Sequence, residues 1–166
     1  GRTIAPLVIP IWDENKHVTG IVDIVNKRAY TMEDGKRVEI PVPEDKVDVV
    51  EEQYAALMES VAETSDEFMD KFFNGESFTY AEVLQGLHAG VRDGSLVPVF
   101  CGSALTGLGT MALLNGIVDL APNPMEAPAE LVTEDDGEPA EFAVAPGAVP
   151  AALVFKTTAD QYGKYS

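Results

Sequence analysis

A turn of small residues follows a short apolar segment, and its composition suits the binding of a flat base. Residues 96–101 (LVPVFC) are predicted to form a short buried strand, and Gly102, Ser103, Ala104 and Leu105 follow directly. Small side chains at the carboxyl end of a strand let a base approach the backbone, and ligands favour that edge of open α/β sheets. A backbone N–H there can donate to a purine carbonyl oxygen. An ordinary tight turn has the same composition, so both interpretations stay open.

Nucleotide hydrolysis needs further residues that the sequence does not supply. A phosphate-binding loop of the form GxxxxGK(S/T) occurs nowhere in the 166 residues. Three near matches are interpreted as chance. Residues 163–166 lack the glycine spacing, residues 26–29 (NKRA) lack the carboxylate of a guanine-reading NKxD, and residues 160–163 (DQYG) follow no phosphate loop. The chain by itself is therefore predicted to have no catalytic residue and no enzyme activity.

Metal and thiol chemistry have equally little support. The two histidines, His17 and His88, form no HxxxH pair, so a metal site would need carboxylates brought in by the fold. Cys101 is the single cysteine and ends an apolar segment, where an unreactive thiol is expected. We expect no metal ligands. A lone cysteine excludes an internal disulfide and favours a reducing, cytoplasmic compartment.

Acidic residues recur through the predicted long helix at offsets of seven, four, three and four. They are Glu52, Glu59, Glu63, Asp66 and Asp70. On one continuous helix this spacing forms a single stripe opposite the apolar face. Like charges one turn apart cost about 0.2–0.5 kcal/mol per pair, and no Lys or Arg lies between Lys46 and Lys71 to offset them. We interpret the stripe as a docking face for a basic or amphipathic partner, with a merely solvated face as the alternative.

The overall charge narrows the classes of partner. Lys and Arg total 11 against 28 Asp and Glu, which gives a formal net charge of −17 at pH 7. Nucleic-acid binding needs dense cationic side chains, and an acidic surface is repelled by anionic membranes. The longest apolar runs are far shorter than the roughly 20 residues of a membrane helix. We therefore expect no direct DNA partner and no membrane partner, and hydrophobic residues, at 46 %, suffice for a core.

The elements that position these residues follow from hydropathy and turn chemistry. Residues 4–12 and 38–42 are predicted strands, residues 18–30 carry a further β-branched apolar run, and Asp34-Gly35 is predicted to form a hairpin turn. A long helix over residues 47–73 follows Pro43, with a break or bend near Thr64-Ser65, and ends at Asn74-Gly75.

The second half of the chain alternates helix, strand and linker. Thr79 and Glu82 fit a capping box that opens a helix ending at Gly94. Residues 109–121 are predicted to be helical, with an inward stripe of Leu108, Met111, Leu114 and Val118. Residues 125–150 are rich in Ala, Pro, Glu and Asp, including Glu134, Asp135 and Asp136, and are predicted to be a linker or mobile loop. Residues 151–156 (AALVFK) are predicted to form a new strand.

In their order and spacing, several of these segments resemble one contiguous part of a translational GTPase of the elongation factor G type. They cover roughly residues 6–128 and read PLVIPI, VTGIVDIVNKRAYTM, EIPVPED, ALMESVAETSDEFMDKFF, PVFCGSALTGLG and IVDLAPNPMEAP. The later segment ALVFKTTADQYGK is similar to the opening strand of the family's second domain. The resemblance implies an α/β fold: a partial P-loop GTPase core, its C-terminal strand and helix, carrying an α+β insert, plus a strand of a β-barrel domain.

The resemblance also implies boundaries along the chain. Residues 1–12 would enter the core and insert, residues 13–95 would form the insert, and residues 96–122 would be the last strand and helix of the GTPase core. Residues 123–150 would be an acidic connector, and residues 151–166 would begin the second domain. The family's NKxD motif would lie before residue 1, so we expect this sequence to be a piece of a longer protein.

The family's function is carried over on the matching residues. Ser103, Ala104 and Leu105 fall on the family's guanine loop, whose backbone N–H groups meet the guanine O6. The implied cofactor is GTP or GDP, with Mg²⁺ held by residues outside this sequence. The implied partners are the ribosome, on which the family acts in translocation, and the C-terminal domain of the ribosomal stalk protein, which the insert's acidic helices face.

Two departures from the family pattern keep other functions open. Asp160 is followed by Gln161-Tyr162 where family members usually carry Pro-Phe, and the connector is longer than expected. These features favour a paralogue over the main translocase. One alternative is a ribosomal GTPase of the tetracycline-protection or release-factor type. An alternative of another class is a non-catalytic acidic protein-interaction module with no link to nucleotides.

Overall fold

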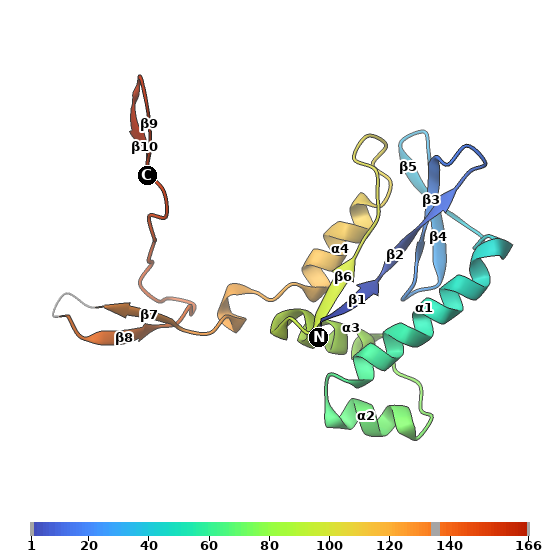
Figure 1. Ribbon diagram of the computed structural model, residues 1–166, viewed down its shortest axis with the longest axis horizontal. Helices are drawn as coiled ribbons and strands as arrows, with labels where there is room; N and C mark the ends of the chain where they lie inside the picture. The colour runs from blue at the N-terminus through green and yellow to red at the C-terminus, as the bar shows by residue number, and fades with distance from the viewer. Residues whose placement is uncertain (1, 134–136, 166) are drawn as a thin grey trace. The chain divides into compact units, whose positions relative to one another are not determined.

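The computed structural model describes residues 2–133 and 137–165 as a mixed α/β protein (Figure 1). The chain divides into two compact units, residues 1–122 and residues 123–166. Four α-helices, all in the first unit, lie in the described part of the chain. None of the described helices combines the length and apolar character that crossing a membrane requires.

The predicted strand over residues 4–12 is two strands that belong to different sheets. β1 (Thr3–Pro6) pairs in parallel with β6 (Leu96–Val99), whereas β2 (Val8–Trp12) pairs antiparallel with β3 (Val18–Asp23). The chain changes sheet at Leu7, whose N–H donates to Val99 O at 2.9 Å and whose carbonyl accepts from Ile24 N at 2.9 Å. One residue thus joins both sheets.

The larger sheet has four antiparallel strands in the order β2-β3-β4-β5. β4 (Arg28–Glu33) and β5 (Lys36–Ile40) are joined at Asp34-Gly35, where φ values of 49° and 72° confirm the predicted hairpin turn. The β3–β4 connection is closed by Asp23, whose carboxylate accepts from the backbone N–H of Asn26 at 3.0 Å and from its side-chain amide at 2.8 Å.

The predicted helix break near Thr64-Ser65 is confirmed. α1 (Glu44–Ala62) ends there and α2 (Asp66–Phe73) begins, because the Thr64 hydroxyl donates to Val61 O at 2.7 Å and Ser65 Oγ caps α2 by accepting from Phe68 N. α3 (Tyr80–Asp93) opens with the predicted capping box and ends at Gly94 in the left-handed conformation. The buried core joins β2, β3 and β4 to α1 and α3, with Val22, Ile24, Val61 and Leu87 fully buried.

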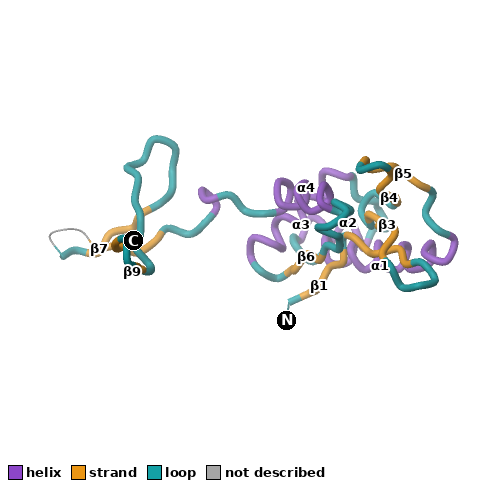
Figure 2. The backbone as a smooth tube through the Cα atoms, turned by 90° about the horizontal axis from the view of Figure 1, so that it is seen from above, coloured by secondary structure: helices purple, strands orange, loops and turns teal. Residues whose placement is uncertain are grey.

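The predicted orientation of the last helix is wrong. α4 (Thr110–Leu120) lies beside α3 (Figure 2), but Met111, Leu114 and Val118 of the predicted inward stripe are 51 %, 49 % and 81 % exposed, and only Leu108 is buried. β6 is also not the buried strand that was predicted, since Val97 and Val99 are exposed. The reason is the same for both elements. Among the described residues, β1 is the sole partner strand of β6. The sheet is therefore too small to cover the outward side chains of β6 and α4.

The second unit holds short, exposed hairpins. A 3₁₀ turn (η1, Pro124–Glu126) precedes β7 (Glu130–Thr133) and β8 (Pro139–Phe142), and β9 (Thr158–Asp160) pairs with β10 (Gly163–Tyr165). The region predicted as a linker therefore contains a hairpin. The strand predicted over residues 151–156 is absent from the described segment, which is irregular and exposed and pairs with no described strand. Glu134, Asp135 and Asp136 lie outside the described residues.

The junction of α2 with α3 should weaken in acid through Glu82. Its carboxylate accepts from Lys71 Nζ at 2.7 Å and from Thr79, and these bonds lower the pKa of Glu82 from 4.5 to about 2. Because the folded pKa lies below the unfolded one, the stabilisation is complete above pH about 4.5 and is lost as the pH falls towards 2. We predict that Glu82→Gln lowers the urea midpoint of unfolding at pH 7. The difference in midpoint between the variant and the wild type should shrink between pH 5 and pH 2. Glu67→Gln is the control. A difference in midpoint between Glu82→Gln and the wild type that does not change with pH contradicts the role given to Glu82.

Candidate functional site

The loop that follows β6 closes on itself through backbone hydrogen bonds. Ser103 N donates to Leu108 O at 2.8 Å, Gly107 N donates to Ser103 O at 2.9 Å, and Thr106 N donates to Ser103 Oγ at 3.3 Å. Ser103 therefore closes the loop, because its N–H, its carbonyl and its hydroxyl each hydrogen-bond to another loop residue. The loop is held in one shape at the carboxyl end of the strand.

The tip of this loop presents backbone donors to solvent. Ala104 is exposed and the Leu105 side chain is 96 % exposed. Within the described part of the chain, the N–H groups of Ala104 and Leu105 have no protein acceptor. Of the three residues predicted to meet a base, Ala104 and Leu105 thus have available donors, whereas the N–H of Ser103 is already used within the loop.

Two glycines make the closed loop possible. A Cβ on Gly109 would stand 2.4 Å from Cys101 O and 2.9 Å from Gly102 Cα, and Gly109 has φ +78°. A Cβ on Gly102 would stand 2.6 Å from Leu108 O. No side chain fits at either place without moving backbone. The glycines therefore bring the two ends of the loop together at the start of α4.

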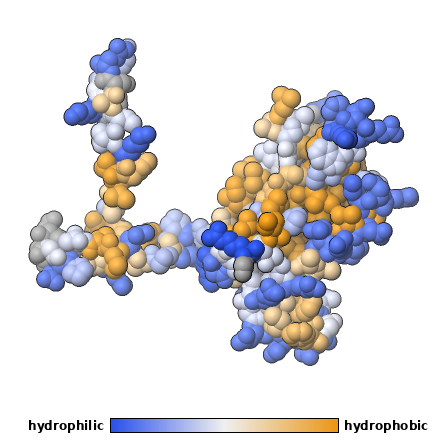
Figure 3. Space-filling view, viewed as in Figure 1, coloured by the Kyte–Doolittle hydropathy of each residue, from blue (hydrophilic) through white to orange (hydrophobic). Residues whose placement is uncertain are grey.

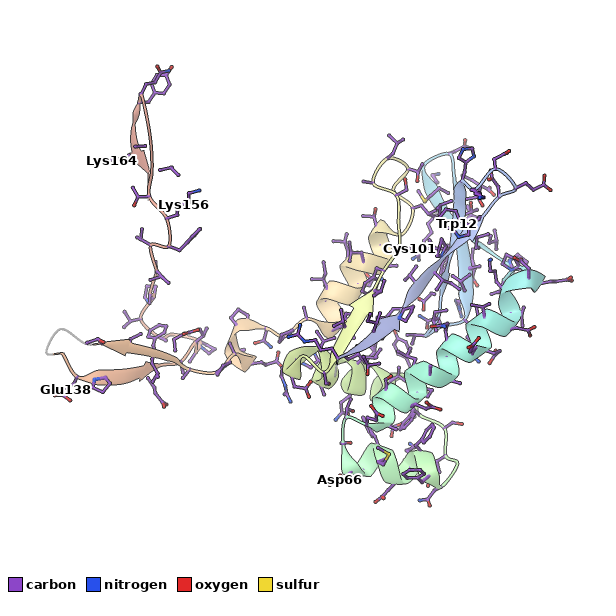
Figure 4. The ribbon with its side chains drawn as sticks, viewed as in Figure 1. Trp12, Asp66, Cys101, Glu138, Lys156 and Lys164 are labelled. Carbon is purple, nitrogen blue, oxygen red and sulfur yellow. The ribbon has the colours of Figure 1, made fainter. Side chains whose placement is uncertain are left out.

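The thiol of Cys101, beside the loop, lies in a partly buried environment. Cys101 comes just after β6 (Figure 4) and is half-buried, and burial raises the pKa of its thiol. A raised pKa reduces the thiolate fraction, as expected for an unreactive cysteine. His17 Nδ1 lies 3.3 Å from Asp13 Oδ2, and the described residues contain no group of three or more His, Cys, Asp or Glu placed to hold a metal ion.

The acidic residues do not form the single stripe that the sequence suggested. Glu52, Glu59 and Glu63 belong to α1 or its C-cap, whereas Asp66 and Asp70 lie on α2 beyond the break, with Asp66 at the start of that helix (Figure 4). All five are exposed. The ion pairs found among the described residues use other carboxylates, namely Asp13, Glu39, Asp45, Glu51 and Glu82. The five charges therefore remain available on two adjacent helices.

One side of α4 is apolar and uncovered. Figure 3 shows apolar side chains gathered over α4, β6 and β1. We call the exposed residues Leu113, Leu114, Ile117 and Val118 the outer face of α4. The outward residues of the two-stranded sheet, Ile4, Val97 and Val99, are exposed as well. Burial of apolar surface stabilises a fold by about 25 cal/mol per Å², and the described residues leave this surface uncovered.

The opposite side of α4 lines a cavity of about 250 Å³. Its walls come from the four-stranded sheet, α3, α4 and the loop before α4, and include Ile21, Tyr30, Leu84, Phe100 and Ala112. Asn115 and Asp119 of α4 also line it. Sequence reasoning missed this cavity. The available signal was that the two polar side chains beyond the first turn of α4 stand four residues apart, on one helical face.

Comparison with known proteins places the fold among solved structures. No family model matches the chain. A crystal structure from Thermus thermophilus, described as ttk003000868, is similar with 28 % identity and a TM-score of 0.68. The similarity covers 76 % of this chain and 20 % of that chain. The chain therefore corresponds to about one fifth of the length of this neighbour.

The stability of the loop should depend on Gly109. We predict that Gly109→Ala lowers the free energy of unfolding by about 2–4 kcal/mol, because the added methyl meets the Cys101 carbonyl as well as an unfavourable φ. Gly75→Ala is the matched control, since Gly75 has φ +72° with nothing within 4 Å, and strain alone costs about 1 kcal/mol. Urea unfolding followed by circular dichroism measures both. Equal losses for the two variants contradict the close approach.

Proposed function

We propose that this chain is part of a translational GTPase of the elongation factor G type, acting on the ribosome, and that it supplies the loop that contacts guanine. The observation that carries the proposal is the pair of available N–H groups at Ala104 and Leu105, held at the carboxyl end of a strand in a parallel sheet. That edge is where α/β proteins bind nucleotides. The sequence resemblance covers the same loop and assigns it the same role.

The donors suit guanine over adenine. Guanine has a carbonyl oxygen, O6, at the position where adenine has an amino group. Two backbone N–H donors would be paired by the oxygen and would be left unpaired against the amino group, which is the basis of strong discrimination. The loop supplies one edge of a base site, so phosphate and Mg²⁺ contacts belong to other residues of the longer protein. We infer that this chain alone does not hydrolyse GTP.

The uncovered surface supports a larger α/β domain. Parallel sheets are normally covered on both faces and contain more than two strands, whereas β1 and β6 have exposed outward residues and no further described partner strand. The outer face of α4 lies exposed in the same unit. We propose that β1, β6 and α4 are the end of a GTPase core whose remaining strands cover this surface. Residues 13–95 are then the insert, residues 123–150 the connector and residues 151–166 the start of a β-barrel domain.

The exposed carboxylates support a protein partner. Among the described residues, five acidic side chains of α1, its C-cap and α2 make no ion pair, and together with a net charge of −17 they attract cationic surfaces. We propose the C-terminal domain of the ribosomal stalk protein as that partner. A non-catalytic acidic interaction module accounts for the carboxylates equally well, but gives no reason for the available donors of the loop.

The guanine loop is tested by removing one donor. In the longer GTPase to which we propose this chain belongs, Ala104→Pro deletes the N–H, and we expect the affinity for fluorescent GDP to fall at least about tenfold. Ala104→Ser keeps the N–H and a small side chain and should bind as the wild type does. The chain of 166 residues alone should give no measurable heat with GTP or GDP in calorimetry. Wild-type affinity in the Ala104→Pro variant contradicts the proposal.

The docking face is tested by charge reversal on α1. Glu59→Lys combined with Glu63→Lys should weaken binding of the stalk domain about tenfold and flatten its salt dependence, because both side chains are exposed and one turn apart. The matched control, Glu130→Lys with Glu141→Lys, makes the same charge change in the second unit. Calorimetry at about 50 mM and about 200 mM salt measures both. Equal weakening by the two pairs indicates net charge rather than a docking face.

A further inference from the structure

The cavity beside α4 has a chemical polarity that the proposed function does not use. It lies wholly within the first unit, between the four-stranded sheet and α4. Most of its wall is apolar or aromatic, with Tyr30, Leu84 and Phe100 among the lining residues. Its charged side chains are few, so their positions define what the cavity can hold.

Two carboxylates line the cavity away from its loop end. The cavity's loop end is fixed by Gly107, where a Cβ would stand 3.8 Å from Met32 Cε. From there α4 runs about 13 Å to Asp119. On β4, Met32 and Arg28 are four residues and therefore about 13 Å apart. Arg28 is the residue that pairs with Asp23 of the neighbouring strand. Asp119 and Asp23 therefore both line the end of the cavity that is remote from the loop.

The opposite end carries a cation. Arg37 pairs with Met32 in the sheet, and its guanidinium lies over the Tyr30 ring at 4.5 Å from the centroid. Among the described residues neither Arg37 nor Asp119 has an ion-pair partner. The cavity thus has an acidic end, an aromatic middle and a basic end.

We propose that this cavity binds a small aromatic monoamine. Its ammonium group would meet Asp119, and its ring would occupy the apolar middle beside Tyr30 and Phe100. A charge-assisted hydrogen bond from an ammonium to a carboxylate is stronger than a neutral one. Arg37 disfavours a second cation at the far end, so a diamine is a poorer ligand. The surrounding charge of −17 adds to the preference for a cation.

Phenethylamine is the probe, with 2-phenylethanol as the neutral match of the same shape. Each is titrated into the isotope-labelled chain while amide shifts are followed by NMR. We expect saturable shifts at residues 107–112, 115 and 119 and an affinity for the amine about tenfold higher than for the alcohol. In Asp119→Asn the two affinities should become equal within about twofold. Asp70→Asn, on exposed α2, should keep the tenfold preference.

A second variant keeps the test independent of Asp119. Ala112→Leu adds three carbons to the cavity wall and should abolish the shifts for both probes, while the dispersion of the remaining amide signals shows that the chain stays folded. Three results overturn the proposal: no saturable shift in the wild type, equal affinity for amine and alcohol in the wild type, or an unchanged preference in Asp119→Asn. If the wild type gives no saturable shift, the cavity is only a hydrated groove.

Discussion

Apolar side chains of α4 lie in solvent, without the hydrophobic stabilisation that their burial would give. A surface helix normally turns its apolar side to the core, yet Leu113, Leu114, Ile117 and Val118 are exposed, while the small or apolar residues Ala112, Gly116 and Leu120 lie on the inner side of α4. α4 is thus apolar on both sides and packs against the described protein on one of them only. The sheet of β1 and β6 repeats the pattern, because its outward residues are uncovered.

The buried core of the first unit is shared between its two sheets. Ile21, Val22 and Ile24 are buried with Val61 and Leu87, and the same core includes Ala5 of β1, Leu96 of β6 and Leu120 of α4. Leu7 ties this core to the parallel pair by hydrogen bonds into both sheets. One core thus holds both sheets, while the outward residues of β1 and β6 and the outer face of α4 remain exposed, which supports the proposal that they belong to a larger domain. The proposed base-binding loop follows β6, where its donors meet solvent.

Local features could be predicted from the sequence, whereas features set by distant partners could not. The Asp34-Gly35 turn, the break at Thr64-Ser65 and the Thr79–Glu82 capping box depend on neighbouring residues and are confirmed. Which face of α4 turns inward depends on the surface that is present to cover it. Hydrophobic periodicity alone therefore predicted the wrong inward face. Ser103, Ala104 and Leu105 could be selected by their position after the strand, but the use of the Ser103 N–H within the loop required the closed geometry created by Gly102 and Gly109.

The most direct measurement compares one substitution in two lengths of protein. Val118 is 81 % exposed, so Val118→Asp should change the free energy of unfolding of this chain by no more than about 0.5 kcal/mol. In the longer GTPase that we propose, in which further strands would cover the outer face of α4, the same change should cost about 3 kcal/mol or more, because it would bury an unpaired charge. A small effect in both proteins would mean that this face meets solvent throughout, which contradicts the account.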